Sequence, residues 1–268
     1  MLKFVVPFAL AASCLSATAT AQQAAPTPSP VAGNLTLASE YRFRGIDQTA
    51  GKPALQGGFD YSHASGVYLG NWNSNISQGA GFPGASLEMD FYGGYKKAFG
   101  DLGLDVGAIY YYYPGSDARF LGAANPHSGK TNSGTVHNTE VYIGASWKWL
   151  SLKWFHAISD YFSLPDTSGT NYLDFSATYD MGGGWGVVGH LGSLRAHSYT
   201  ELNYTDYKLG VTKDITGWVL GAALVGASTK GGCPFDATNA PYCFTNPAGQ
   251  SPRDAGRNTI VLSVGKTF

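Results

Sequence analysis

The chain contains a succession of segments in which apolar and polar side chains alternate one by one. In residues 139–149, the clearest case, Val141 and Ile143 alternate with Glu140 and Tyr142. Because successive side chains of a β-strand point to opposite faces, this pattern predicts strands with one apolar and one polar face. About twelve such segments follow one another, each close to the roughly 9–11 residues that a tilted strand needs to cross a bilayer. We therefore expect an all-β fold, a transmembrane antiparallel up-and-down β-barrel of about twelve strands.

The expected strands cover most of the chain from residue 35 onward. In chain order they are 35–44, 54–62, 66–74, 87–99, 102–113, 139–149, 150–159, 172–179, 185–192, 204–214, 218–227 and 258–268. The facing of 66–74 stays open, because Tyr68 and Trp72 alternate with Val67 and Leu69, which are also apolar.

The last expected strand, 258–268, has the features of a strand that closes a barrel. Ile260 and Leu262 share its apolar face with Lys266, and the sequence ends on Phe268. A lysine on this face is tolerable near the membrane surface, where its side chain can snorkel. Bacterial outer-membrane barrels end in this way, so we expect membrane lipid to cover the apolar face. We also expect the outer-membrane assembly machinery to bind this strand as a partner.

The connections between the expected strands alternate between long and short. The long ones are 46–51, 76–85, 114–138, 160–170, 193–203 and 228–257, and the short ones are 62–65, 100–101, 149–150, 180–184 and 215–217. Outer-membrane barrels have short periplasmic turns and longer external loops, so all the long loops are expected outside the cell. A soluble β-sandwich has a similar composition but no reason for this alternation.

The first residues have the pattern of an export signal. A short basic start is followed by the apolar run 4–12, and Ala19-Thr20-Ala21 fits a cleavage site before Gln22. Lipoprotein cleavage at Cys14 is disfavoured, because the three preceding residues include no large aliphatic side chain. We expect a cleaved signal peptide (1–21), a short periplasmic segment (22–33) and a barrel (34–268) in the bacterial outer membrane.

The composition and the cysteine positions limit which ligands and partners can be expected. Only 13% of the residues are charged and the formal net charge is −1, so nucleic acid is not expected to bind. Cys233 and Cys243 form an even pair in an expected external loop, which predicts a disulfide in an oxidising compartment. A metal site would need closer spacing and further ligands nearby, so neither a metal nor a cofactor is expected.

Aromatic side chains gather near the ends of the expected strands. Rings at these positions predict the two girdles that mark the membrane–water boundaries of a barrel, although core packing of a soluble barrel is the competing interpretation. The candidate interface aromatics are Tyr110, Tyr112, Trp147, Trp149, Trp154, Trp185, Trp218 and Phe268.

Charged side chains on the polar faces are the candidate functional residues, because charge facing lipid is costly and these faces therefore line the lumen. In a wet pore they would set ion preference. In a plugged barrel they would pair with one another and satisfy buried charge. The sequence leaves both possibilities open. The candidates are Glu40, Arg42, Arg44, Asp60, Glu88, Asp90, Lys96, Asp105, Glu140 and Lys148.

Enzymatic motifs are weak in this chain. It contains no Gly-x-Ser-x-Gly sequence. His156 with Ser159, and His190 with Ser193, are three residues apart and so fall on opposite faces of a strand. A site assembled across several strands stays possible, but we expect no enzyme.

Six segments have a sequence pattern seen before in one family: 39–46, 53–61, 66–75, 88–95, 203–208 and 266–268. They resemble the proteobacterial TorF (Gcw_chp) family of outer-membrane porins. The resemblance spans essentially the whole mature chain and implies an outer-membrane β-barrel with a pore, while the long loops match no pattern of the family.

The predicted function is that of an outer-membrane porin, with passive diffusion of small polar solutes or ions through a narrow charged lumen. The alternative is a closed barrel that acts as a structural or surface-interaction protein through its external loops. A lipid-modifying barrel enzyme comes third.

Overall fold

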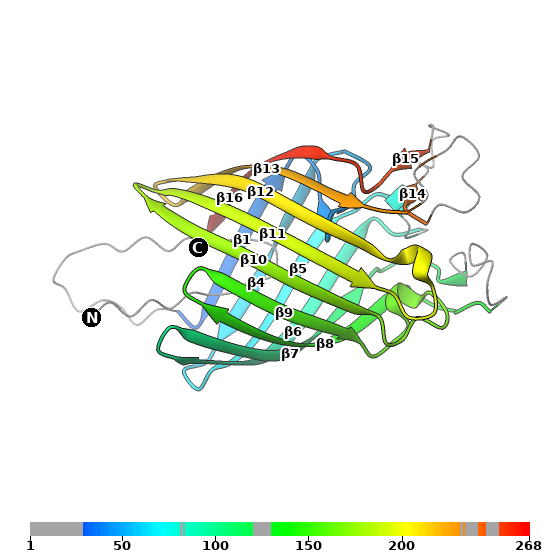
Figure 1. Ribbon diagram of the computed structural model, residues 1–268, viewed down its shortest axis with the longest axis horizontal. Coiled ribbons are helices and arrows are strands. Elements are labelled where there is room, and N and C mark those ends of the chain that lie inside the picture. Colours follow the sequence, from blue (N-terminus) through cyan, green and yellow to red (C-terminus); the bar gives the residue numbers. More distant parts are fainter. Residues whose placement is uncertain are drawn as a thin grey trace.

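The computed structural model describes residues 29–80, 82, 84–119, 130–230, 233, 241–244 and 252–268. Its main element is a closed antiparallel barrel in which each strand pairs with its neighbours in chain order (Figure 1). The prediction of a twelve-stranded barrel is therefore confirmed. The barrel strands are β1 Val31–Ala38, β4 Ala54–Ser62, β5 Val67–Asn75, β6 Leu87–Phe99, β7 Leu102–Tyr112, β8 His137–Trp147, β9 Leu150–Ala157, β10 Asn171–Gly182, β11 Trp185–Arg195, β12 Tyr204–Ile215, β13 Trp218–Ser228 and β16 Thr259–Thr267.

Short elements lie in the connections between the barrel strands. They are the strands β2 Arg42–Phe43, β3 Ile46–Asp47, β14 Cys243–Phe244 and β15 Arg253–Asp254, and the 3₁₀ helices η1 Gln78–Ala80, η2 Tyr161–Ser163 and η3 Thr200–Leu202. None of the helices in the described ranges is long and apolar enough to cross a membrane.

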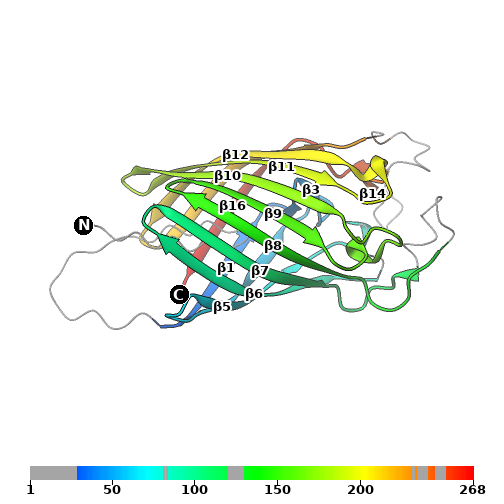
Figure 2. The same cartoon turned by 60° about the horizontal axis from the view of Figure 1, so that its bottom comes forward.

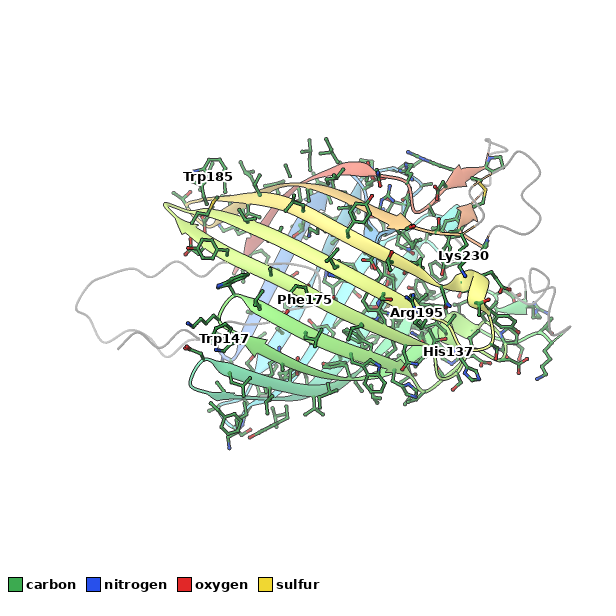
Figure 3. All side chains as sticks on the ribbon, viewed as in Figure 1. His137, Trp147, Phe175, Trp185, Arg195 and Lys230 are labelled. Atoms are coloured by element: carbon green, nitrogen blue, oxygen red, sulfur yellow. A yellow bond between two sulfur atoms is a disulfide. The ribbon has the colours of Figure 1, made fainter. Side chains whose placement is uncertain are left out.

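The barrel has two different ends (Figures 1 and 2). One end carries the short turns and the C-terminus, and we call it the turn end. The other end, the loop end, carries the six long connections, so the predicted alternation of loop lengths is confirmed. Trp147 and Trp185 lie at the turn end, whereas His137, Arg195 and Lys230 lie at the loop end (Figure 3).

The barrel closes where β1 meets β16. Five residues of β1 pair with β16, from Asn34 opposite Thr267 to Ala38 opposite Ser263. Beyond that ladder, Gly33 N–H donates to the Phe268 carbonyl oxygen at 2.7 Å, and Phe268 N–H donates back at 2.9 Å. The final residue therefore takes part in closing the barrel.

Large apolar side chains cover the outside of the barrel. Leu35, Leu37, Ile260 and Leu262 are all more than 45% exposed, as expected for side chains that face lipid. In β5, Tyr68 and Trp72 are buried inside the barrel while Val67 and Leu69 are exposed, which settles the facing that the sequence left open.

The first expected strand, 35–44, is wrong at both ends. β1 begins at Val31 and stops at Ala38, because the chain bends at Ser39 and Glu40. Residues 42–47 then form a separate hairpin, in which Arg44 and Gly45 both have positive φ, 48° and 79°. Positive φ at two central residues is the geometry of a tight hairpin turn and cannot continue a strand.

Two further expectations concern the export signal and the cysteine pair. The expected signal peptide, 1–21, lies outside the described residues. Cys233 and Cys243 form a disulfide in the connection between β13 and β16, with a Cα–Cα distance of 5.1 Å, which confirms that pairing.

Candidate functional site

Residues 42–47 form a hairpin inside the barrel, which we call the inner hairpin. Its strands β2 and β3 pair Arg42 with Asp47 and Phe43 with Ile46. A Cβ atom on Gly45 would lie 2.6 Å from the Asp206 Cβ atom, so the tip packs directly on β12. Glycine is required there by this close approach as well as by its positive φ.

The Arg44 side chain connects the inner hairpin to the opposite wall of the lumen. Its guanidinium donates two hydrogen bonds to the Glu140 carboxylate on β8, at 2.7 and 2.9 Å. A further bond of 3.2 Å reaches the Tyr161 hydroxyl, and the guanidinium lies 4.0 Å from the centre of the Tyr172 ring. Burial alone would lower the pKa of Arg44, but the Glu140 carboxylate raises it well above the ordinary value, so the guanidinium stays charged.

A second ionic cluster holds the base of the inner hairpin. Glu40 pairs with Arg42 at 3.1 Å and with Arg257 at 2.6 Å, and Arg257 also pairs with Asp47 at 2.7 Å. Arg42 donates to the backbone oxygen of Ala255 at 2.8 Å. The two arginines and two carboxylates balance in charge. The cluster joins the inner hairpin to the β13–β16 connection, which contains the disulfide.

Aromatic side chains fill the remaining space at the loop end. Phe43 packs edge-on against Tyr111 with ring centroids 5.4 Å apart, and Phe82 stacks on Tyr113 at 4.0 Å. Tyr111 and Tyr113 are fully buried. The loop-end half of the lumen is therefore packed like a protein core.

Farther toward the turn end, one side of the lumen is lined by large polar and aromatic side chains, and we call it the aromatic wall. Asp105 accepts from Tyr68 at 2.6 Å and pairs with Lys153 at 2.7 Å. Tyr68 also contacts the Tyr142 hydroxyl, and Lys96 lies 4.3 Å from the centre of the Tyr68 ring. These contacts span β5 to β9 and fix the side chains in place.

The other side of the lumen is lined by small side chains, and we call it the small-residue wall. It is formed by β1, β11, β12, β13 and β16. A cavity of about 170 Å³ lies against it, and we call this space the side cavity. Its lining side chains include Thr36, Ala38, Gln56, Val188, Lys208, Thr212, Val219, Ala223, Val225 and Ser263, with Glu40 and Arg42 of the hairpin region at the loop-end side. Because Val219 and Gly265 also line it, the side cavity extends close to the turn end.

A Ser–His–Asp arrangement is present inside the barrel, formed by residues that are distant in sequence. The two imidazole nitrogens of His190 lie 3.1 Å from the Ser176 hydroxyl and 2.7 Å from the Asp206 carboxylate. Ser176 donates its own hydrogen to Asp174 at 2.5 Å. The serine proton is thus directed to a carboxylate and away from the imidazole, so the set binds strands β10 to β12 together and is not arranged as a nucleophile and its base.

The structure places most of the predicted lumen residues inside the barrel, in ion pairs or beside hydroxyls. Asp60 accepts from the Tyr92 hydroxyl at 2.5 Å, and Glu88 accepts from Tyr113 at 2.9 Å. Asp90 is also buried, only 6% exposed. Lys148 instead lies in the β8–β9 turn, 4.7 Å from the centre of the Trp147 ring, because β8 ends one residue before it.

The predicted interface aromatics divide between the two ends of the barrel. Trp147, Trp149, Trp185, Trp218 and Phe268 lie at or next to turn-end strand termini, and Tyr110 and Tyr112 lie at the loop-end terminus of β7. Trp154 lies within β9. The Lys266 ammonium is 5.0 Å from the centre of the Trp218 ring near the turn end, where it can snorkel.

The residues of the lumen that were not predicted from the sequence include Lys153, His190, Asp206, Lys208 and Arg257. The first four are on inward faces of strands that the sequence did predict, so alternation alone could have identified them. Arg257 lies in a long connection, where no periodic pattern marks an inward side chain.

Comparison with known proteins places the chain in a family. The family described as "Bacterial protein of unknown function (Gcw_chp)" matches residues 22–268, so the chain belongs to the Gcw_chp family. This confirms the family resemblance, while the TorF name stays a prediction. No curated protein matches the sequence.

The solved structure of the NanC porin has a similar barrel fold. The NanC porin structure has a TM-score of 0.51 and 9% identity, with 87% of this chain and 98% of that chain covered. OmpT of Vibrio cholerae has a TM-score of 0.44 and 9% identity, with 89% and 97% covered. At such identities the similarity shows the fold alone, a β-barrel resembling those of outer-membrane porins.

Proposed function

We propose that this member of the Gcw_chp family is a narrow outer-membrane channel for the passive diffusion of small polar solutes. The observation that carries the proposal is the unequal filling of the lumen. In a plugged barrel, side chains from both walls would fill the lumen. Here the side chains of the small-residue wall leave the side cavity unfilled along the barrel.

In this proposal the turn end faces the periplasm and the loop end faces the exterior. Residues 1–21 are removed on export, and the assembly machinery binds the strand that ends at Phe268. The inner hairpin forms the constriction, and the predicted lumen charges, from Glu40 to Glu140, set its electrostatic environment. Solutes pass along the small-residue wall, because the aromatic wall is held rigid by its own hydrogen bonds and ion pairs.

A closed barrel with a structural or surface-interaction role is the second candidate. It is favoured by the pairing of Arg44 with Glu140 across the lumen, where both side chains are almost fully buried. If this contact never opens, the external loops remain the functional surface.

Single-channel recording of refolded residues 22–268 in a planar bilayer tests the proposal. A matched variant replaces residues 42–47 by two glycines, since Gln48 N–H already donates to the Tyr41 oxygen at 2.9 Å and the chain can turn there. Glu140→Gln accompanies the deletion, and Glu40 keeps its ion pair with Arg257, so no buried carboxylate is left without a partner. Heat-shifted gel mobility establishes that both proteins are folded barrels.

We expect stepwise currents from the wild-type protein and larger steps from the hairpin-deleted variant. If both fold and neither conducts, the channel proposal is wrong and the closed barrel is supported. If only the deleted variant conducts, the inner hairpin is a plug that must move before solutes can pass.

A further inference from the structure

Lys208 is a cation inside the barrel without a partner in the described part of the chain. It lies on β12, paired in register with His190 of β11 and Val225 of β13, and its side chain lines the side cavity. No hydrogen bond or ion pair to the Lys208 ammonium joins it to any described residue. The Lys208 side chain is exposed to the side cavity, so the donors of its ammonium can be satisfied by water or by an anion there.

Two acidic groups on the same strand or the same cavity as Lys208 are already engaged. Asp206, two residues earlier on the same face of β12, accepts from Tyr172 at 2.9 Å and from His190 at 2.7 Å. Glu40, which also lines the side cavity, is bound by both Arg42 and Arg257. Neither carboxylate is therefore free to neutralise the lysine.

Two further polar atoms at the side cavity have no partner. The Arg42 Nε and the Thr212 hydroxyl oxygen are both buried and make no hydrogen bond with described residues. Arg42 is only 3% exposed, and both residues line the cavity that Lys208 enters. These side chains therefore add an unused N–H donor and an unused hydroxyl to the lining that Lys208 shares, and such groups are suited to an anionic oxygen.

The part of the lining that flanks Lys208 on the neighbouring strands is apolar. Val188, Ala223 and Val225 are each less than 10% exposed and lie on the strands that flank Lys208. A strongly hydrated inorganic ion gains nothing from such walls, whereas the short hydrocarbon part of an organic anion does. The volume of about 170 Å³ accommodates a small molecule of this kind together with water.

We propose that the side cavity is a binding site for small organic monocarboxylates, with Lys208 as the charge that recognises the carboxylate. This inference rests on the proposed channel function and names the substrate class for the same lumen. The hydrocarbon part lies against the valines of β11 and β13.

The test compares wild-type protein with Lys208→Gln, which keeps a polar side chain one atom shorter than lysine but removes the charge. Lys213→Gln is the matched control. It makes the same change on the same strand, but the Lys213 ammonium binds the Gly183 oxygen in the β10–β11 turn at 2.7 Å and does not line the cavity. Lys208→Arg is the conservative variant that keeps the charge.

Reversal potentials in asymmetric potassium chloride measure charge selectivity, and added sodium butyrate measures block of the chloride current. One unit charge at contact distance in a wet lumen changes anion occupancy by about tenfold, so we expect the chloride-to-potassium permeability ratio to fall about tenfold in Lys208→Gln. Block by butyrate should disappear in Lys208→Gln and persist in Lys208→Arg and Lys213→Gln.

Calorimetric titration of the folded barrel with sodium butyrate, and with sodium chloride for comparison, tests binding independently of conduction. Binding of butyrate that Lys208→Gln abolishes supports the site even if no channel opens, and would then contradict only the channel function. Unchanged selectivity together with no butyrate binding to the wild-type protein would overturn the inference. Equal binding of chloride and butyrate would overturn the organic substrate class.

Discussion

Removal of the Arg44 side chain is expected to release the inner hairpin from the opposite wall. Arg44 and Glu140 are 6% and 1% exposed, and their two hydrogen bonds measure 2.7 and 2.9 Å. Removing one partner of such a buried pair costs about 3–5 kcal/mol, because the other charge is left without compensation. In Arg44→Ala the Glu140 carboxylate keeps only a long contact of 3.3 Å from the Tyr111 hydroxyl.

We expect this loss of free energy to appear mainly as undocking of the inner hairpin from the opposite wall. The barrel strands keep all of their inter-strand hydrogen bonds in this variant. At about 1.4 kcal/mol per tenfold change, the undocked population rises by about 10²- to 4 × 10³-fold. Hydrogen exchange measured by mass spectrometry on the segment 41–49 reports this opening directly. Peptides from β10 to β13 should keep their protection and serve as an internal reference.

A double-mutant cycle separates this ion pair from general damage. We expect the combination of Arg44→Met with Glu140→Gln to cost less than either single change, since no unpaired charge remains. Arg119→Ala is the matched control. It breaks an exposed pair with Asp117 and should leave exchange unchanged. Wild-type exchange rates in Arg44→Ala, or additive effects in the cycle, would refute the assignment of Arg44 as the anchor.

Two further predictions concern the barrel wall and the cysteine loop. Gly58→Ala should destabilise the folded barrel by about 1–3 kcal/mol in urea unfolding, because its Cβ atom would lie 1.8 Å from the Asn71 backbone oxygen. Gly189→Ala, which meets nothing within 4 Å, should be nearly neutral, and equal effects of the two changes would contradict this packing argument. Replacing Cys233 and Cys243 together by Ser should speed limited proteolysis between β13 and β16 without changing the heat-shifted gel band. Loss of the folded band in that variant would mean that barrel assembly itself depends on the disulfide.

The sequence predicted the barrel well because lipid imposes one simple rule on every spanning strand. Each strand must present apolar side chains outward, and this repeats at period two whatever the neighbouring strands are. The cleanest segment, 139–149, became β8 with a shift of two residues at each end. Where both faces were apolar, as in 66–74, the same rule could not assign the facing.

The lumen was harder to predict, because its contacts depend on which strands face each other across the barrel. Arg42 and Arg44 alternate with Tyr41 and Phe43, so they fitted a continued strand as well as they fitted a hairpin. The informative signal was Arg44-Gly45, where glycine at the second turn position is typical of a tight hairpin. The pairing of Arg44 with Glu140, 96 residues away, had no sequence signal at all.

The charge balance inside the barrel indicates that different residues control the opening of the lumen and its ion selectivity. Arg44 neutralises Glu140, Lys153 neutralises Asp105, and the cluster around Glu40 balances within itself. Paired charges of this kind exert a weak field beyond their own contacts, so the arginines of the inner hairpin should govern whether the lumen opens more than which ion passes. Selectivity should then follow Lys208, whose charge no described residue compensates. Changes at Arg44 should therefore alter conductance or exchange at nearly constant reversal potential, whereas changes at Lys208 should shift the reversal potential and leave the inner hairpin docked.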